Sequence, residues 1–345
     1  MEIQTVCLLQ DFLALESDWQ RLWRLQKSPK IFQHHAWVFA FIEAFCQARK
    51  WMVLVAREGG AVSAILPIWE DARTGCWRLA GSPNSDYNYL LGDPAAIVRM
   101  LPHAASLGVR SVLFEAMPEG PAFWQSLKTA GLCVVETGAP APCWHITLNK
   151  ASIRALREKK GMKDNERRLS RVGALRLRVI THGMDQQGML ETLFEQHRKR
   201  WNPGAKSSQF NYSASCDFYR RVCASPDLTP FVCFSVLEAG EQVLACHIGF
   251  VQGDSFIYYK PAYDPAFKGA GKLQLCMLME EALRLGLKEF DFTRGNEPYK
   301  VELATGVRYN HEARLFFSTA AGLIFRSRQW LRRSVPRDTE GLALT

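Results

Sequence analysis

Apolar and polar positions along the first half of the chain predict helices that alternate with strands, the pattern of an α/β protein. An apolar stretch with helical spacing, FQHHAWVFAFIEAF, begins at Phe32. Two continuous apolar runs follow it, WMVLVA and AVSAILPIW, and Glu58-Gly59-Gly60 separates them. Runs of this length on either side of a glycine turn are typical of two neighbouring strands in a sheet.

The second half repeats this order of elements. A helix-like stretch, FNYSASCDFYRRV, begins at Phe210, 178 residues after Phe32, and the strand-like runs FVCFSVLE and QVLACHIGFV follow it. Farther along, Leu285 ends a helical stretch that precedes a strand, 178 residues after Leu107, which does the same. Two equal intervals over several elements predict a duplicated α/β unit with mixed sheets.

The Pro- and Ala-rich stretch TGAPAPC, residues 137–143, is the predicted connection between the two copies. We therefore expect a first domain at 1–145, a basic connecting helix at 146–180 and a second domain at 181–345.

Composition narrows the class of protein. The chain has 345 residues, of which 48% are hydrophobic, which is enough for two globular domains. Its first residues include Glu2, Asp11 and Glu16 and contain no basic start followed by an apolar run, so we expect no signal peptide and a cytoplasmic protein. No apolar run approaches the roughly 18 residues that a spanning helix needs.

Cysteine and histidine patterns predict no metal site. The ten cysteines are scattered without a C-x-x-C pair, and the eight histidines include no H-E-x-x-H. We expect reduced, mostly buried thiols.

Positive charge is concentrated in residues 150–178. Eleven Lys or Arg side chains stand there against three acids, which accounts for +8 of the net charge of +9. Such a run is typical of a solvated helix, and it is also typical of a surface that binds a polyanion, such as tRNA or an acidic acyl-carrier protein. A second basic and apolar stretch, residues 323–337, favours a helix that caps the fold over one that lies on a membrane surface.

Only the second copy has a candidate phosphate-binding loop. An amphipathic helix begins at KGAGK, residues 268–272, where small residues let a ligand approach the first free N–H groups of the helix. The positive end of the helix dipole, with Lys268 and Lys272, favours a pyrophosphate. A tight turn is the alternative for Gly269, Ala270 and Gly271, since the segment lacks the Walker A residues.

Several of these segments resemble the CelD-like (acetyltransferase-6, BioF2-like) branch of the GNAT acyltransferases, a family similar to the Fem aminoacyltransferases. The resemblance is carried by YDPAF before the small-residue loop, by FDFTRG.E.YK after the helix, and by SDYNYLLGDP, FQHHAW and HRKRW elsewhere. It implies a tandem duplicated GNAT-like (acyl-CoA N-acyltransferase) fold. The second copy would hold the acyl donor, and a cleft between the copies would hold the acceptor.

The resemblance implies an N-acyltransferase that moves an acyl group from acyl-CoA or an acyl-carrier-protein thioester to an amine, such as an amino sugar, in exopolysaccharide or cell-envelope metabolism. Lys268-x-x-Gly271-x-Leu273 satisfies only part of the coenzyme A motif of GNAT enzymes. Two alternatives follow, an aminoacyl-tRNA-dependent Fem-like transferase and a non-catalytic scaffold in a polysaccharide synthesis complex.

Acyl transfer to an amine requires a base for the ammonium proton and an acid for the departing thiolate. His247 is a candidate base, and a hydrogen-bonded strand histidine is the alternative. Tyr299 stands where GNAT enzymes often place their acidic tyrosine, unless it only covers the edge of the core. Glu297 is a second candidate base.

The same loop contains candidates for binding the substrate. Arg294 and Lys300 would bind a phosphate or carboxylate on the acceptor, whereas Asp291 would brace the loop. In the first copy, the resemblance places Asp86 and Tyr87 near the acceptor, and an ordinary Asx turn is the alternative there.

Overall fold

The structure is a computed structural model that describes residues 1–82, 84–180, 185–203 and 207–334. The chain forms two compact units. The first unit contains Met1–Pro142 and the described residues from Tyr309 onward, and the second contains Cys143–Arg308.

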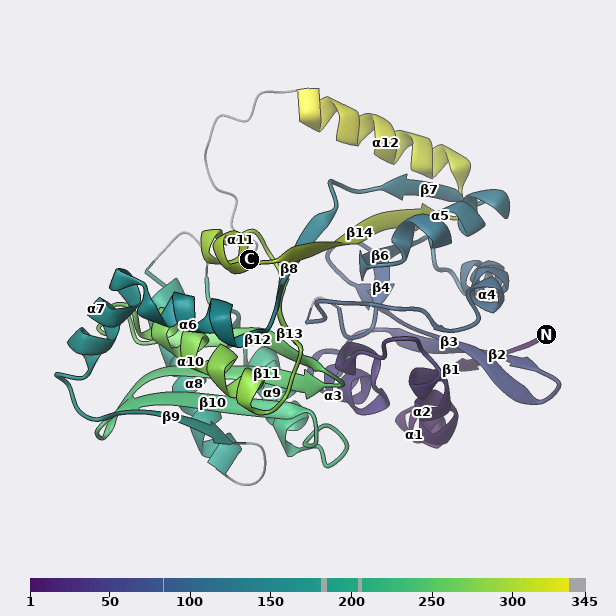
Figure 1. The fold of residues 1–345 in the computed structure, drawn as a ribbon. Coiled ribbons are helices and arrows are strands. Elements are labelled where there is room, and N and C mark those ends of the chain that lie inside the picture. Colours follow the sequence, from purple (N-terminus) through teal and green to yellow (C-terminus); the bar gives the residue numbers. More distant parts are fainter. Residues whose placement is uncertain (83, 181–184, 204–206, 335–345) are drawn as a thin grey trace. The chain divides into compact units, whose positions relative to one another are not determined.

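The first unit is built on a sheet with the strand order β1-β2-β3-β4-β6-β14 (Figure 1), to which β5 adds beside β3 and β7 beside β14. Its strands are β1 (Glu2–Val6), β2 (Trp51–Glu58), β3 (Ala61–Asp71), β4 (Cys76–Leu79), β5 (Leu91–Gly92), β6 (Ser111–Met117), β7 (Cys133–Glu136) and most of β14 (Gly306–Phe316). Its helices are α1 (Leu9–Ala14), α2 (Glu16–Arg24), the 3-10 helix η1 (Ile31–Gln33), α3 (His35–Phe45), α4 (Pro94–Ser106), α5 (Gly120–Thr129) and α12 (Thr319–Ser334).

The second unit has its own sheet, with the strand order β8-β13-β12-β11-β10-β9. Its strands are β8 (Ala141–Thr147, from Cys143), β9 (Leu175–Ile180), β10 (Val232–Ala239), β11 (Gln242–Gln252), β12 (Ser255–Tyr263) and β13 (Glu289–Arg294). Its helices are α6 (Lys150–Glu158), α7 (Lys160–Leu169), α8 (Asp185–Trp201), the 3-10 helix η2 (Gln209–Asn211), α9 (Ser213–Ala224), α10 (Ala270–Arg284) and α11 (Pro298–Leu303).

The two units repeat one topology. In each unit, an edge strand is followed by helices, a three-stranded antiparallel meander and a further helix. The next strand then pairs in parallel with the last strand of the meander, β6 with β4 in the first unit and β13 with β12 in the second. The next position in each sheet is taken by a strand from the other half of the chain. The end of β14 pairs with β6, and β8 pairs with β13.

This exchange changes the predicted domains. Residues from Tyr309 onward lie with the first unit instead of within a domain at 181–345, because β14 forms its hydrogen bonds with β6 and β7. Residues 146–180 are not a free connecting helix. Two helices, α6 and α7, pack on α10, and β9 pairs with β10, so the basic segment is an integral part of the second unit.

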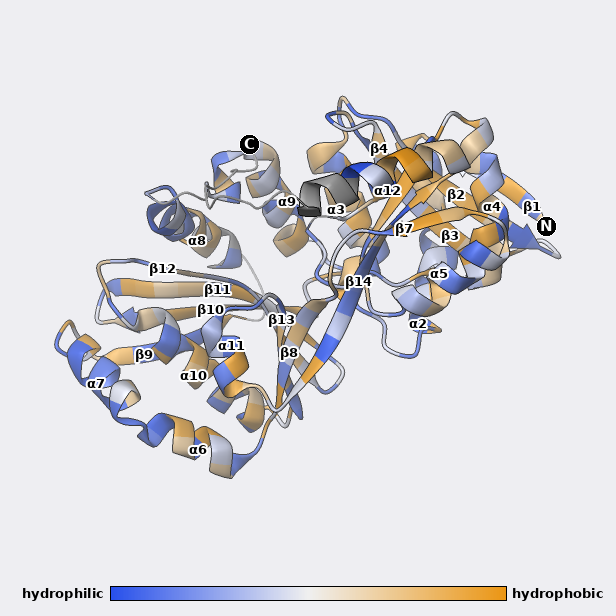
Figure 2. Ribbon diagram, turned by 90° about the horizontal axis from the view of Figure 1, so that it is seen from above, coloured by the Kyte–Doolittle hydropathy of each residue, from blue (hydrophilic) through white to orange (hydrophobic). Residues whose placement is uncertain are grey.

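Helices cover both faces of the second sheet (Figure 2), with α8 and α9 on one face and α6 and α10 on the other. The buried side of α10 includes Leu273, Cys276, Leu278 and Met279, at the helical spacing that the sequence predicted. Together with Phe256, these side chains belong to one apolar core. Burial of that face holds the start of α10 against the ends of the strands.

Helix α12 covers part of the first sheet. Phe325 packs on Phe316, and Gly322 lies against Cys133, whereas Leu323 and Ile324 are exposed. Residues 335–337 of the basic stretch lie outside the described residues. Among the helices described, none is long and apolar enough to cross a bilayer.

Candidate functional site

The strands β12 and β13 separate part-way along the second sheet. Their parallel pairing runs from Ser255 and Glu289 to Ile257 and Asp291 and then stops. Beyond it, Thr293 adopts a positive φ of 58°, and its hydroxyl lies 3.5 Å from the carbonyl oxygen of Tyr258. No described strand pairs with β12 on this side after Ile257, so the sheet is open there.

Helix α10 begins beside this opening. Gly269 precedes the helix with a φ of +87°, a conformation that favours glycine, and its carbonyl oxygen accepts the first helical bond, from the N–H of Leu273. Among the described residues, the N–H groups of Gly271 and Lys272 have no hydrogen-bond partner. Two free donors at the positive end of a 15-residue helix are suited to an anion.

The predicted loop therefore lies at a helix start, with Lys268 and Lys272 exposed and Ala270 buried. The basic helix α7 covers one side of the loop. The guanidinium of Arg168 donates to the carbonyl oxygen of Lys268 at 2.6 Å and to Oδ1 of Asn165 at 2.5 Å. Both side chains lie where a Cβ on Gly269 would stand. The basic segment is thus fixed beside the candidate phosphate site.

Tyr263, at the end of β12, lies between this loop and helix α8. A Cβ on Gly271 would stand 2.7 Å from Cδ1 of Tyr263, so the glycine allows the ring to pack directly on the backbone. On its other side, the guanidinium of Arg200 lies 4.5 Å from the centre of the same ring. The start of α10 and the last turn of α8 therefore meet across one aromatic side chain.

His247 does not lie at the opening as a base should. It is fully buried, its ring stacks on Tyr258 at 4.4 Å, and its Nε2 accepts the backbone N–H of Tyr259 at 3.2 Å. The other ring nitrogen, Nδ1, faces the hydroxyl of Ser235 at 3.5 Å. Burial lowers the pKa of His247 to about 3. The prediction of a catalytic base is not supported, because both ring nitrogens are engaged away from solvent.

Two phenols stand closer to the opening. Tyr299, on α11, is half-buried and lies edge-on to Phe292. Burial and the nearby Glu297 carboxylate raise its pKa, whereas Arg200 lowers it. Tyr258, which the sequence did not single out, has a pKa that is raised mainly by burial and further by the nearby Tyr299. Both phenols are proton donors at neutral pH.

The loop after β13 holds itself together. Lys300 is buried, and its ammonium donates to the carbonyl oxygen of Arg294 at 2.8 Å and pairs with the Glu297 carboxylate at 3.0 Å. A Cβ on Gly295, at a φ of +136°, would stand 2.8 Å from that ammonium. Lys300 therefore braces the loop instead of presenting its charge to a ligand, and Glu297, although exposed, is its ion-pair partner and not a free base.

Asp291, which was predicted to brace the loop, lies in the same region. It is fully buried, and its Oδ1 accepts the N–H of Thr293 at 2.8 Å. Its Oδ2 lies 4.0 Å from the guanidinium of Arg308. Arg294 remains half-exposed, and its role in binding an acceptor stays a prediction.

The equivalent region of the first unit is filled by its own chain. Asn88 bonds through its N–H to the carbonyl oxygen of Ala116, at 2.7 Å, and through its side chain to that of Glu115. Asp86 and Tyr87 are buried beside it. Their main-chain oxygens accept from Asn310 and Gln33. This packing places the two predicted substrate-binding side chains in the interior of the first unit.

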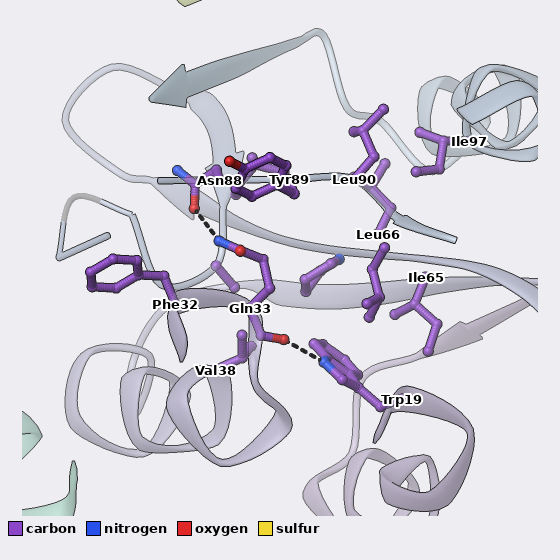
Figure 3. Close-up of a pocket in the computed structure, with 14 residues that line it drawn as sticks. Trp19, Phe32, Gln33, Val38, Ile65, Leu66, Asn88, Tyr89, Leu90 and Ile97 are labelled. Atoms are coloured by element: carbon purple, nitrogen blue, oxygen red, sulfur yellow. Dashed lines mark hydrogen bonds between the residues drawn. The ribbon is translucent and has the colours of Figure 1, made fainter. Parts of the chain in front are cut away.

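A cavity of about 30 Å³ lies next to this segment (Figure 3). Gln33 stands in it between Asn88 and Trp19, whose indole N–H donates to the Gln33 carbonyl oxygen at 2.8 Å. The other lining residues are mostly apolar, and the volume is that of about one water molecule. The cavity is too small for a substrate.

Two side chains of α8 that border the opening, His197 and Arg200, were not predicted as site residues. Their segment, HRKRW, was noted only for its resemblance to a family pattern. Their spacing of three residues places both on one helix face and could have flagged them. No group of three or more His, Cys, Asp or Glu side chains in the described part of the chain could hold a metal ion.

Comparison with known families decides what kind of domain contains this opening. Residues 157–301 match the Acetyltransferase (GNAT) domain. The matched part of the chain contains the separated strands, the start of α10 and Tyr299. No curated protein matches the sequence.

Solved structures with the same fold superimpose on nearly the whole chain. FemX superimposes with a TM-score of 0.59 at 10% identity, covering 94% of this chain and 99% of that one. The C-terminal domain of a putative lysylphosphatidylglycerol synthetase from Agrobacterium fabrum gives a TM-score of 0.55 at 13% identity, covering 93% and 97%.

A tandem GNAT protein from the clavulanic acid biosynthesis pathway gives a TM-score of 0.50 at 13% identity, covering 90% of this chain and 98% of that one. At such identities the likeness concerns the fold. The chain has a mixed α/β, tandem GNAT fold, as the internal repeat and the family resemblance together predicted, and residues 157–301 of its second unit match the Acetyltransferase (GNAT) domain.

Proposed function

We propose that the chain is an N-acyltransferase that uses the second unit to bind an acyl thioester and transfers the acyl group to an amine. The observation that carries this proposal is the combination of separated strands β12 and β13 with two unpartnered N–H groups at the start of α10, inside the segment that matches the GNAT domain. Acyl-CoA is the donor that GNAT domains typically use.

The residues present fit such a donor. Gly271 and Lys272 would bind a pyrophosphate through their N–H groups, with the Lys268 and Lys272 ammonium groups beside it. The edge of β12 after Ile257, where β13 no longer pairs with it, would lie along an extended amide-containing arm, as a neighbouring strand does. A thioester supplies an activated carbonyl carbon and a thiolate leaving group.

Tyr299 would protonate the departing sulfur. Burial and Glu297 keep its phenol protonated at neutral pH, and its position on α11, directly after β13, puts it next to the point where the strands part. A phenol that donates to a developing thiolate contributes a general-acid effect of about 10²- to 10⁴-fold.

The acceptor class and the pathway rest on the sequence resemblance. The CelD-like pattern supports an amino sugar or a similar amine in exopolysaccharide or cell-envelope metabolism. A cytoplasmic location, with peripheral membrane contact through residues 323–337, is part of the same proposal; the exposed Leu323, Ile324 and Arg326 of α12 support the contact.

The donor could also be delivered by a larger carrier. Lys160, Lys163 and Arg171 are exposed on or just after α7, the helix whose Arg168 contacts the donor loop. This proximity supports docking of a polyanion, either an acyl-carrier protein or a tRNA, through residues 150–178. Binding to tRNA would favour the Fem-like alternative.

Thermal stability with coenzyme A, acyl-carrier protein and tRNA as separate ligands tests the proposal. A ligand at 100 times its dissociation constant adds about 2.7 kcal/mol to the free energy of unfolding. We expect acetyl-CoA to raise the melting temperature. Stabilisation by tRNA alone would indicate the aminoacyl-tRNA alternative, and no shift with any of the three would indicate a non-catalytic scaffold.

A further inference from the structure

Helix α8, which packs on β12, carries the half-buried imidazole of His197 near its last turn. His197 bonds through Nδ1 to the hydroxyl of Ser208 at 2.8 Å. That hydroxyl also accepts the N–H of Phe210, so it is held in one place, and the Phe210 ring packs edge-on against the imidazole at 4.9 Å. The orientation of the ring is therefore fixed from behind.

The other nitrogen of this ring is available. Among the described residues, Nε2 of His197 has no hydrogen-bond partner. This arrangement is the reverse of the one at His247, where Nε2 accepts a backbone N–H in the interior. An imidazole oriented through one nitrogen and open at the other has the geometry of a general base.

A cation without an acidic partner stands one turn farther along α8. Arg200 lies between two rings, 4.9 Å from the centre of the Trp201 ring and 4.5 Å from that of Tyr263. No carboxylate in the described part of the chain pairs with it, whereas the preceding Lys199 pairs with Glu195 and Asp264. The two rings hold the guanidinium in place, which leaves its N–H donors for a ligand.

Lys260 of β12 supplies a second charge at the same place. Its ammonium lies 4.6 Å from the centre of the Tyr259 ring. Burial is the main cause that lowers the pKa of His197 to about 3, and the positive charges of Lys260 and Arg200 lower it further. The Trp201 ring lies 5.9 Å from the His197 ring and 4.9 Å from the Arg200 guanidinium, so an anion bound by Arg200 would lie close to the imidazole.

The charge of Arg200 also reaches the donor side of the opening. Arg200 is one of the groups that lower the pKa of the Tyr258 and Tyr299 phenols against the raising effect of burial. Tyr263 connects Arg200 to Gly271 at the start of α10. An acceptor held by Arg200 would thus lie beside a thioester held by the donor loop.

Resting on the proposed acyltransferase function, we propose that the acceptor is an amine that also carries an oxyanion, either a phosphate or a carboxylate. Arg200 and Lys260 bind this oxyanion. Nε2 of His197 takes a proton from the amino group. The anion would neutralise the two charges that disfavour a protonated His197. The pKa of His197 therefore rises when the acceptor is in place, although burial still lowers it.

The acceptor enters as an ammonium ion and loses two protons. His197 takes the first, which frees the nitrogen lone pair to form the N–C bond to the thioester carbonyl carbon. The C–S bond breaks, and its electron pair leaves on sulfur. The second proton reaches this sulfur by way of the Tyr299 phenol, which ends unchanged, and His197 returns its proton to solvent.

The first test needs no turnover. Two-bond ¹H–¹⁵N spectra of the histidine rings of the full chain are recorded between pH 5 and 8 in sodium phosphate and in sodium chloride of equal ionic strength, with His197→Gln to assign the signal. We expect phosphate to shift the His197 signal toward that of the protonated ring at the acid end of this range, and Arg200→Gln to abolish the response. The same response in chloride, or none in phosphate, overturns the anion site.

The second test compares matched acceptors with acetyl-CoA as donor, glucosamine against glucosamine 6-phosphate and glycinamide against glycine. A charge-assisted bond predicts about ten- to hundredfold higher kcat/KM for the anionic member. Arg200→Gln should remove this preference through KM, whereas Arg24→Gln, at the end of the corresponding helix of the first unit, should not. His197→Gln should lower kcat for both members and leave the KM of acetyl-CoA unchanged.

The outcomes separate this inference from the proposed function. The inference is overturned if the enzyme prefers the neutral amines, or if Arg200→Gln lowers kcat/KM equally for the neutral and the anionic acceptor. The transferase function would stand in either case. If acetyl-CoA does not bind at all, the proposed function fails, and the phosphate response of His197 still decides whether Arg200 and Lys260 form an anion site.

Discussion

The backbone N–H of Tyr259 donates to Nε2 of His247 at 3.2 Å, inside the second sheet. This bond satisfies an N–H group of β12 in the fully buried interior. In His247→Leu the N–H would lose its acceptor, which costs about 1–3 kcal/mol. We expect that loss in urea unfolding at pH 7.5, with the KM for acetyl-CoA little changed. Unaltered stability combined with a large fall in kcat would instead restore His247 as the base.

Stability should fall in mild acid. The folded-state pKa values of His197 and His247 are both about 3, below the ordinary value of 6.5, so between these values the unfolded chain binds more protons than the folded one. Stability is full above about pH 6.5 and decreases as the pH falls toward 3, by up to about 1.4 kcal/mol per pH unit for each histidine. Urea midpoints at pH 7.5, 6 and 5 measure the slope. The change of stability with pH should be smaller in His247→Leu than in the unsubstituted protein. Equal slopes would contradict a lowered pKa of His247 in the folded state.

Gly269 and Gly286 provide a matched pair at the two ends of α10. Both have positive φ, +87° and +79°, so alanine strains the backbone at either position by about 1 kcal/mol. Only at Gly269 would the new Cβ collide with Asn165 and Arg168, whereas nothing lies within 4 Å of Gly286. We expect Gly269→Ala to weaken acetyl-CoA binding about tenfold or more by calorimetry, with Gly286→Ala near the unsubstituted value. Similar affinities for both variants would indicate that the loop does not bind the donor.

The duplicated fold was predictable because hydrophobic periodicity records which face of each element is buried. The helix at α10 and the strands β10 and β11 lie where their apolar patterns indicated. The exchange of β8 and β14 was not predictable, since a strand's own pattern does not say which neighbour its N–H groups will meet. The predicted division at 137–143 lies near the true change of unit at Cys143, but the return at Tyr309 has no Pro- or Gly-rich signal.

The part of the candidate site that a local sequence pattern records could be predicted, and the rest could not. Glycines and lysines at 268–272 signalled a helix start directly in the sequence, and the structure has one there. The roles of His247 and Lys300 depended on burial and on hydrogen bonds to distant backbone groups, Tyr259 and Arg294, which local sequence does not record. The importance of His197 likewise comes from its contact with Ser208, eleven residues later.

Tyr299 offers a test of the proposed acid. Tyr299→Phe removes the phenolic proton and keeps the ring contact with Phe292. We expect kcat to fall about 10²-fold or more with little change in KM. Because burial raises the pKa of this phenol, the rate should show no loss from its ionisation between pH 6 and 9. Tyr212→Phe, at an exposed tyrosine of the same unit, is the control and should leave kcat unchanged.

The first unit contains a largely buried ion pair whose loss should be costly. The guanidinium of Arg78 donates to both Glu115 oxygens, at 2.8 and 2.5 Å, and the Ser82 hydroxyl donates to one of them at 2.6 Å. Glu115→Gln would leave the Arg78 charge with only the Asp71 carboxylate, at 3.5 Å. We expect a loss of about 3 kcal/mol in urea unfolding.

Two further variants test whether burial of the charge causes this loss of stability. At the surface pair of Arg154 and Glu158, whose side chains are 81% and 54% exposed, Glu158→Gln should cost no more than about 0.5 kcal/mol. In the first unit, replacing both partners together, Arg78→Met with Glu115→Leu, should recover much of the loss, because the Asp71 carboxylate, which then loses Arg78, keeps Arg73 at 3.8 Å. A double variant as unstable as Glu115→Gln would instead show that the hydrogen bond from Ser82 to the carboxylate, and not the charge of Arg78, is what the first unit depends on at this position.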